Sequence, residues 1–113
     1  MKNIMSVDLE DHFCDLPFSE WHNHQSRIKI GTRKILELFE KYDTKATFFT
    51  LGYVAEQNPE LIEEIQLKGH EIATHGYSHQ NLQQMSKESF EIDLCKSISI
   101  LEKITKQKVL GFR

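Results

Sequence analysis

The stretch Ala46-Thr47-Phe48-Phe49-Thr50 has the composition of a buried strand, and it indicates the fold class of the chain. Its β-branched and aromatic side chains favour extended structure. A short apolar run between helical patterns is typical of a parallel strand covered on both faces. We therefore expect strands that alternate with helices on either side of residues 46–50.

Three other segments have strand-like patterns. Residues 4–9 are short, apolar and partly β-branched, residues 70–74 match more weakly, and residues 109–112 form a further apolar run. Residues 11–27 mix aromatic and polar side chains with Pro17 and are predicted to form one long loop. Long loops in compact domains are often functional.

Three helices are predicted between these strands. The second begins at Asn58-Pro59, an N-cap residue followed by proline at the first helical position, and ends at the basic residue and glycine of Lys68-Gly69. The third is capped by Ser86. Each helix has an apolar stripe at helical spacing. The stripes are, in chain order, Ile35, Leu38, Phe39 and Tyr42; Leu61, Ile62 and Ile65; and Phe90, Leu94, Ile98, Leu101 and Ile104.

The expected order of elements is therefore β-α-β-α-β-α-β. Such alternation predicts an α/β fold whose parallel strands are joined by right-handed helical crossovers. In folds of this kind the active site forms at the carboxyl ends of the strands. The residues that follow each predicted strand are therefore the first candidates for a functional site.

Composition excludes several classes of protein. The 113 residues suit a single domain, and a net charge of −3 gives no basic footprint for nucleic acid. No apolar run approaches the length of a membrane span. Residues 1–5 lead directly to Asp8 and leave no room for a signal peptide, so a cytoplasmic location is expected. Cys14 and Cys95 lack metal-binding spacing and should be reduced, with Cys95 buried on its helix.

Two polar clusters follow predicted strands. Asp8-Leu9-Glu10-Asp11 ends the first strand, and His75-Gly76-Tyr77-Ser78-His79 follows the third. Two histidines four residues apart can face one point, and a carboxylate added to them makes a common site for a catalytic divalent metal. Crowded carboxylates also repel one another unless a cation is near. The alternatives are a surface turn with two solvated histidines and a solvated acidic turn or helix cap. The HExxH pattern of metalloproteases is absent.

The other aromatic and histidine residues carry weaker signals. His12 could line the cleft, although a loop contact is at least as plausible. The segment Trp21-His22-Asn23-His24 has the composition of a sugar-binding loop, but a surface loop with one aromatic anchor is the favoured interpretation. His70 opens a strand and should lie at the end opposite the site.

The two clusters resemble the motifs of a known family. Ser6–Asp11 resembles the first acidic motif of the polysaccharide deacetylases, the NodB-homology group of carbohydrate esterase family four. Thr74–His79 resembles their HxxxH metal motif, and Gly111–Arg113 resembles the start of their third motif, where a proline normally follows the arginine. Ala46–Phe49 is similar to the strand before the family's second helix, and Gly69–Ile72 is similar to the segment that leads into the HxxxH motif. The resemblance spans essentially the whole chain and implies the first half of a distorted (β/α) barrel.

The resemblance implies a metal-dependent hydrolase that removes N-acetyl groups from an amino-sugar polymer or oligosaccharide. The metal, with Zn²⁺ expected first and Co²⁺, Ni²⁺ or Fe²⁺ as alternatives, would be held by His75, His79 and one carboxylate. The first motif here is Asp-x-Glu-Asp, similar to a subgroup linked to exopolysaccharide export, so that carboxylate is Glu10 or Asp11. Glu10 is preferred because it lies two residues from Asp8, on the same side of an extended strand.

The resemblance also implies roles for three other residues. Asp8 would act as the general base. Arg113 would orient Asp8 and hold it ionised through a charge-assisted hydrogen bond, although a frayed, charged end is an equal alternative. A backbone N–H near Tyr77 would contact the substrate and stabilise the oxyanion.

A complete βα barrel needs about 250 residues. We therefore expect residues 1–113 to be the N-terminal portion of a longer catalytic domain, without the family's later motifs and their general-acid histidine. Open sheet edges would favour self-association. The alternative functions are a related amide hydrolase, such as a sugar deformylase, and a catalytically incomplete fragment that keeps only the metal site. A non-haem iron oxygenase uses similar ligands, but usually on an all-β fold.

Overall fold

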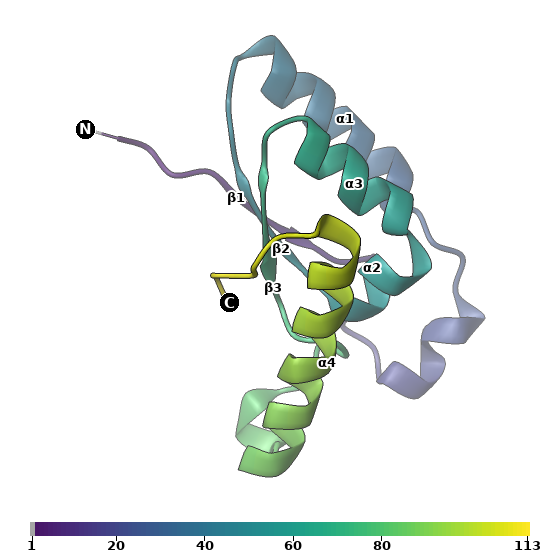
Figure 1. Ribbon diagram of the computed structural model, residues 1–113. Helices are drawn as coiled ribbons and strands as arrows, with labels where there is room; N and C mark the ends of the chain where they lie inside the picture. The colour runs from purple at the N-terminus through teal and green to yellow at the C-terminus, as the bar shows by residue number, and fades with distance from the viewer. Residues whose placement is uncertain (1) are drawn as a thin grey trace.

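The helices of the protein gather on one side of a three-stranded sheet in the computed structural model, which describes residues 2–113 (Figure 1). The strands are β1 (Ser6–Leu9), β2 (Thr47–Thr50) and β3 (Glu71–Thr74). The α-helices are α1 (Ile28–Lys41), α2 (Gly52–Gln57), α3 (Pro59–Leu67) and α4 (Lys87–Thr105), and two 3₁₀ helices are η1 (Phe18–Asn23) and η2 (Leu82–Gln84).

The sheet has the order β1-β2-β3, and both strand pairs are parallel. Val7 lies level with Phe48, which in turn lies level with Ile72, and this row belongs to the hydrophobic core beneath the helices. The next row contains Asp8 and Phe49, whose side chains point to the opposite face because strand side chains alternate. The predicted parallel α/β arrangement is therefore confirmed, and Asp8 lies on the face away from the core.

Helix α1 forms as predicted, and half of its predicted stripe is correct, because Ile35 is half-buried and Phe39 packs against the core. Its buried residues are Ile28, Thr32 and Leu36, spaced four residues apart. Leu38 and Tyr42, which the prediction placed in the stripe, are 53% and 68% exposed. The prediction was therefore wrong for Leu38 and Tyr42. A side chain two positions from Leu36 lies about 200° around the helix axis, so Leu38 is turned away from the core.

Helix α2 was not predicted. Glycine disfavours helix, and α2 begins with Gly52. A Cβ atom on Gly52 would lie 2.8 Å from Cδ2 of Tyr77 and 2.9 Å from Cα of Ser97, so α2 can approach α4 this closely only with glycine here. The tertiary contact therefore outweighs the local preference.

The predicted loop 11–27 contains the short helix η1. Within it, Trp21 is only 1% exposed, and its Nε1–H donates to the carbonyl oxygen of Leu16 at 2.9 Å. The interpretation of this segment as a surface loop with one aromatic anchor is therefore confirmed.

No helix within residues 2–113 is both long and apolar enough to span a membrane.

The helix ends follow the predicted signals with one exception. Gly69, at φ +84°, follows the last turn of α3 in the left-handed conformation that glycine adopts readily. The Ser86 hydroxyl accepts the N–H of Ser89 at 3.0 Å and caps α4. Asn58 does precede α3, but its side chain makes no capping bond and donates instead to the carbonyl of Val54. The predicted capping role of Asn58 was therefore wrong.

The predicted fourth strand, residues 109–112, is reduced to a single parallel bridge between Thr74 and Phe112. The Thr74 N–H donates to the Gly111 carbonyl at 2.9 Å, and the Arg113 N–H donates to the Thr74 carbonyl at 3.2 Å. Two hydrogen bonds do not form a ladder, so the segment lies beside β3 without becoming a strand. These bonds nevertheless place Arg113 next to the carboxyl end of β3.

Cys95 is exposed, so its predicted burial was wrong. The buried row of α4 consists of Ser97, Leu101 and Thr105. Cys95 lies two residues before Ser97 and therefore points to the opposite side of the helix.

His70 lies before β3, as predicted. The residue is only 6% exposed, and burial lowers the pKa of its ring.

The corrected face of α1 gives the first prediction. Leu36→Ala should reduce the free energy of unfolding by about 2 to 5 kcal/mol, because it leaves a cavity in the core. Leu38→Ala, on the same helix, removes an exposed side chain and should cost less than about 1 kcal/mol. Urea denaturation followed by circular dichroism measures both. Equal losses, or a larger loss for Leu38→Ala, would contradict this assignment of the buried face.

Candidate metal centre

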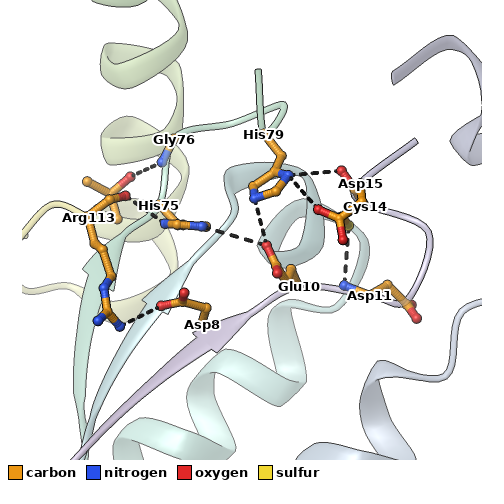
Figure 2. A network of polar contacts seen from close by, with 10 residues as sticks. Asp8, Glu10, Asp11, Cys14, Asp15, His75, Gly76, His79 and Arg113 are labelled. Carbon is orange, nitrogen blue, oxygen red and sulfur yellow. Dashed lines mark hydrogen bonds and ion pairs between the residues drawn. The ribbon is translucent and has the colours of Figure 1, made fainter. Parts of the chain in front are cut away.

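Glu10, His75 and His79 form a group that could hold a metal ion. Glu10 follows β1, and both histidines follow β3, so the group lies at the carboxyl ends of the strands as predicted (Figure 2). Each residue offers one ligand atom, and the three atoms lie within 4.8 Å of one another. The Nε2 atoms of His79 and His75 lie 3.0 Å and 3.6 Å from Oε2 of Glu10.

The other ring nitrogen of each histidine faces a backbone oxygen. The Nδ1 atom of His75 lies 2.6 Å from the main-chain oxygen of Arg113, and that of His79 lies 3.0 Å from the carbonyl of Cys14. A carbonyl oxygen only accepts hydrogen bonds, so each Nδ1 must carry the proton. In the neutral rings, both Nε2 atoms therefore present lone pairs towards Glu10.

While both rings are neutral, this geometry leaves Glu10 without a donor. Its Oε2 atom is buried and has no hydrogen-bond partner, although two histidine nitrogens are near. A buried carboxylate oxygen that faces two lone pairs is electrostatically unfavourable. A divalent cation bound by all three atoms would remove this conflict. Two imidazole nitrogens and one carboxylate oxygen fit Zn²⁺ with an open coordination position, and they also suit Co²⁺, Ni²⁺ or Fe²⁺.

Asp8 lies beside this group on the same face of the sheet (Figure 2). Its Oδ1 atom accepts a hydrogen bond of 3.1 Å from Nη1 of Arg113, which also donates to the hydroxyl of Ser6 at 3.1 Å. The Arg113 guanidinium lies over the ring of Phe49, 5.4 Å from its centroid. The structure thus brings Asp8 and Arg113 together as predicted.

Asp11, the alternative carboxylate, has a different environment. It accepts hydrogen bonds from the Ser26 hydroxyl, from the Arg27 N–H at 3.1 and 3.2 Å, and from the N–H of His12 at 3.0 Å. Burial raises the pKa of Asp11, but these hydrogen bonds outweigh it, so the pKa is lowered overall. Asp11 therefore anchors the segment before α1, and Glu10 is the carboxylate that faces the histidines. The His12 ring, also against Asp11, is not in the group.

Tyr77 is not directed at the ligand group. Its N–H donates to Oδ2 of Asp93 at 2.7 Å, and its hydroxyl donates to Glu56 at 2.7 Å. Burial raises the pKa of this hydroxyl, and the Lys96 ammonium lies 3.5 Å from the ring centroid. The predicted contact between the oxyanion and a backbone N–H near Tyr77 stays a prediction. The N–H of Tyr77 itself has a carboxylate partner in this structure.

Sequence reasoning missed two residues that contact the site. Cys14 contributes its carbonyl to His79, whereas its thiol is buried, with a pKa that desolvation raises to about 12. The sulfur of this thiol accepts the N–H of Asp11 at 3.2 Å and does not belong to the ligand group. Asp93 was not selected from the sequence, because it lies next to Leu94 of the apolar stripe predicted for α4. Its position four residues before Ser97, on the most buried row of that helix, was the available signal.

A pocket of about 360 Å³ lies beside the histidines. His75 and His79 line one part of it, and Leu82, Met85 and Phe90 line an apolar part. A pocket with both polar and apolar walls suits a ligand that has polar and apolar parts.

The fold and the site define a parallel α/β protein with a two-histidine, one-carboxylate group at the strand ends. The polysaccharide deacetylase family model matches residues 25–113. The chain therefore belongs to the polysaccharide deacetylase family. A peptidoglycan-N-acetylglucosamine deacetylase of Bacillus cereus is 37% identical over 73 residues, which are 65% of this chain and 26% of that protein.

Two solved structures have the same fold. A candidate polysaccharide deacetylase from Mycobacterium smegmatis superposes with a TM-score of 0.84 at 26% identity, over 97% of this chain and 41% of that one. A CE4 family pseudoenzyme from Bacillus anthracis superposes with a TM-score of 0.69 at 33% identity, over 72% of this chain and 29% of that one. These likenesses confirm the predicted fold class, part of a distorted (β/α) barrel of the NodB type. The chain spans between 26% and 37% of the length of three curated relatives that it matches.

The contacts of Asp11 lead to a prediction about stability without metal. Asp11→Ala should lower the free energy of unfolding in a chelating buffer by about 1 to 3 kcal/mol, because it leaves partly buried donors unpaired before α1. Asp15→Ala is the control, since that side chain is 88% exposed and should change stability by less than about 0.5 kcal/mol. Denaturant titration measures both changes. A loss for Asp11→Ala no larger than the control would show that these hydrogen bonds do not anchor α1.

Proposed function

We propose that this chain carries the metal-binding half of an active site that hydrolyses N-acetyl groups on the amino sugars of a polysaccharide. The buried, unpartnered oxygen of Glu10 between two histidine lone pairs carries this proposal. Membership of the polysaccharide deacetylase family supports the reaction, and the name of the Bacillus cereus relative supports N-acetylglucosamine polymers as the substrate class.

A divalent ion held by Glu10, His75 and His79, with Zn²⁺ as the first expectation, would supply an activated water and a positive charge for the carbonyl oxygen. Asp8 is the proposed general base, which takes a proton from the attacking water. Arg113 supports this role, because the hydrogen bond from its Nη1 atom fixes the orientation of the Asp8 carboxylate.

The pocket beside the histidines is the proposed binding site for the N-acetyl sugar. Its apolar wall, which includes Leu82 and Phe90, could cover the acetyl methyl group while the polar wall faces the hydroxyl groups. Self-association through open sheet edges and a cytoplasmic location are proposed with the function and remain predictions from the sequence. The relation to exopolysaccharide export also remains a proposal.

A second candidate function is metal binding without turnover. The likeness to a CE4 family pseudoenzyme of Bacillus anthracis favours this candidate. Hydrolysis of a related amide, such as the formyl group of a sugar amine, would use the same residues. Acetate and formate release distinguish these reactions.

The proposed metal site gives the next prediction. The chain should bind one Zn²⁺ or Co²⁺ per molecule, and both His79→Ala and Glu10→Gln should weaken binding by about 100-fold or more, because each removes one of three ligands. Isothermal titration calorimetry measures affinity and stoichiometry. His24→Ala is the matched control, since His24 is an exposed histidine outside the ligand group.

Equal affinity for the metal in wild type and His79→Ala would contradict the metal site.

If the wild-type chain binds metal, the loaded chain is incubated with N-acetylglucosamine oligomers and with peptidoglycan, and the released acetate is measured enzymatically. Acetate release that disappears in Asp8→Asn would support the deacetylase. Metal binding with no acetate or formate release would favour the second candidate.

A further inference from the structure

Asp93, on α4, contacts the loop that carries both histidines. Its Oδ2 atom accepts the N–H of Tyr77 at 2.7 Å, and its Oδ1 atom accepts the hydroxyl of Ser78 at 2.5 Å. Ser78 is buried and Asp93 is half-buried. Both oxygens of one carboxylate therefore hold the residues between His75 and His79.

The backbone of this loop needs such support. Gly76 has φ +77° and His79 has φ +52°, so the loop enters the left-handed region twice, and this region is unfavourable for a residue with a Cβ atom. A Cβ atom on Gly76 would lie 2.9 Å from Oδ2 of Asp93. The close approach of the carboxylate and the shape of the loop therefore depend on each other.

The carbonyl groups of the same loop are held by α2. The N–H of Gly52 donates to the Gly76 carbonyl at 2.8 Å, and the N–H of Tyr53 donates to the Tyr77 carbonyl at 3.3 Å. These donors belong to the main chain, so a side-chain substitution does not remove them. The donors of the loop, at Tyr77 and Ser78, instead depend on the side chain of Asp93.

We propose that Asp93 is a positioning residue that holds the loop 75–79 in the conformation in which both Nε2 atoms meet Glu10. This inference rests on the proposed metal site. Asp93 itself does not belong to the ligand group. Its effect passes through the backbone, because a ligand such as His79 in a left-handed conformation is directed correctly only while the loop keeps its shape.

The test compares Co²⁺ binding by the wild-type chain, Asp93→Ala, Asp93→Asn and Glu91→Ala, with the visible absorption of Co²⁺ as a report on coordination geometry. Asp93→Ala should weaken binding by about 10-fold or more and change the absorption spectrum. Asp93→Asn should stay close to wild type, because its amide can accept from Tyr77 and donate to Ser78. Glu91→Ala removes an exposed acid from the same helix and should change neither readout.

Unchanged affinity and spectrum for Asp93→Ala would overturn the inference, even if the metal-free chain melts at a lower temperature, because that result means a purely structural role. Failure of the wild-type chain to bind Co²⁺ would overturn the metal site itself, and the inference with it. If Asp93→Ala does not fold by circular dichroism, Ser78→Ala decides. It removes one of the two contacts and should weaken Co²⁺ binding a few-fold, and wild-type affinity would again overturn the inference.

Discussion

The hydrogen bonds from the ring nitrogens of His75 and His79 to two backbone oxygens are the constraint on which the candidate site depends. Because these oxygens accept and never donate, each neutral ring carries its proton on Nδ1 and turns a lone pair towards Glu10. Three electron-pair donors then meet around one point. A neutral imidazole that could rotate or change tautomer would instead donate to the carboxylate and form an ordinary buried hydrogen bond.

The fold supplies both oxygens from segments far apart in the sequence. The carbonyl of Cys14 comes from the loop after β1, and the oxygen of Arg113 comes from the segment that bridges to Thr74 beside β3. The parallel sheet places the carboxyl ends of β1 and β3 at one edge, where Glu10 and the histidines follow them. The site is therefore a property of the tertiary structure, although each of its parts can be seen in the sequence.

The sequence predicted the general architecture, and it predicted which polar residues lie together at the strand ends, because both depend on local patterns. Apolar periodicity found β2, α3 and α4, and the preference for Glu10 followed from the alternation of side chains along a strand. The failures have a different cause. Helix α2 begins with a glycine that local propensity disfavours, and it forms because Gly52 packs against Ser97. The buried face of α1 and the reduction of residues 109–112 to one bridge likewise depend on packing that no local pattern records.

The tautomers of His75 and His79 test the central claim most directly. Long-range ¹H–¹⁵N correlation spectra of the metal-free chain at pH 8, assigned with single histidine variants, distinguish a protonated from an unprotonated ring nitrogen. The account predicts that both rings carry the proton on Nδ1 and that both Nε2 atoms are unprotonated. A proton on Nε2 of either ring would contradict it, because that nitrogen would then satisfy Glu10 and leave no set of converging lone pairs for a metal.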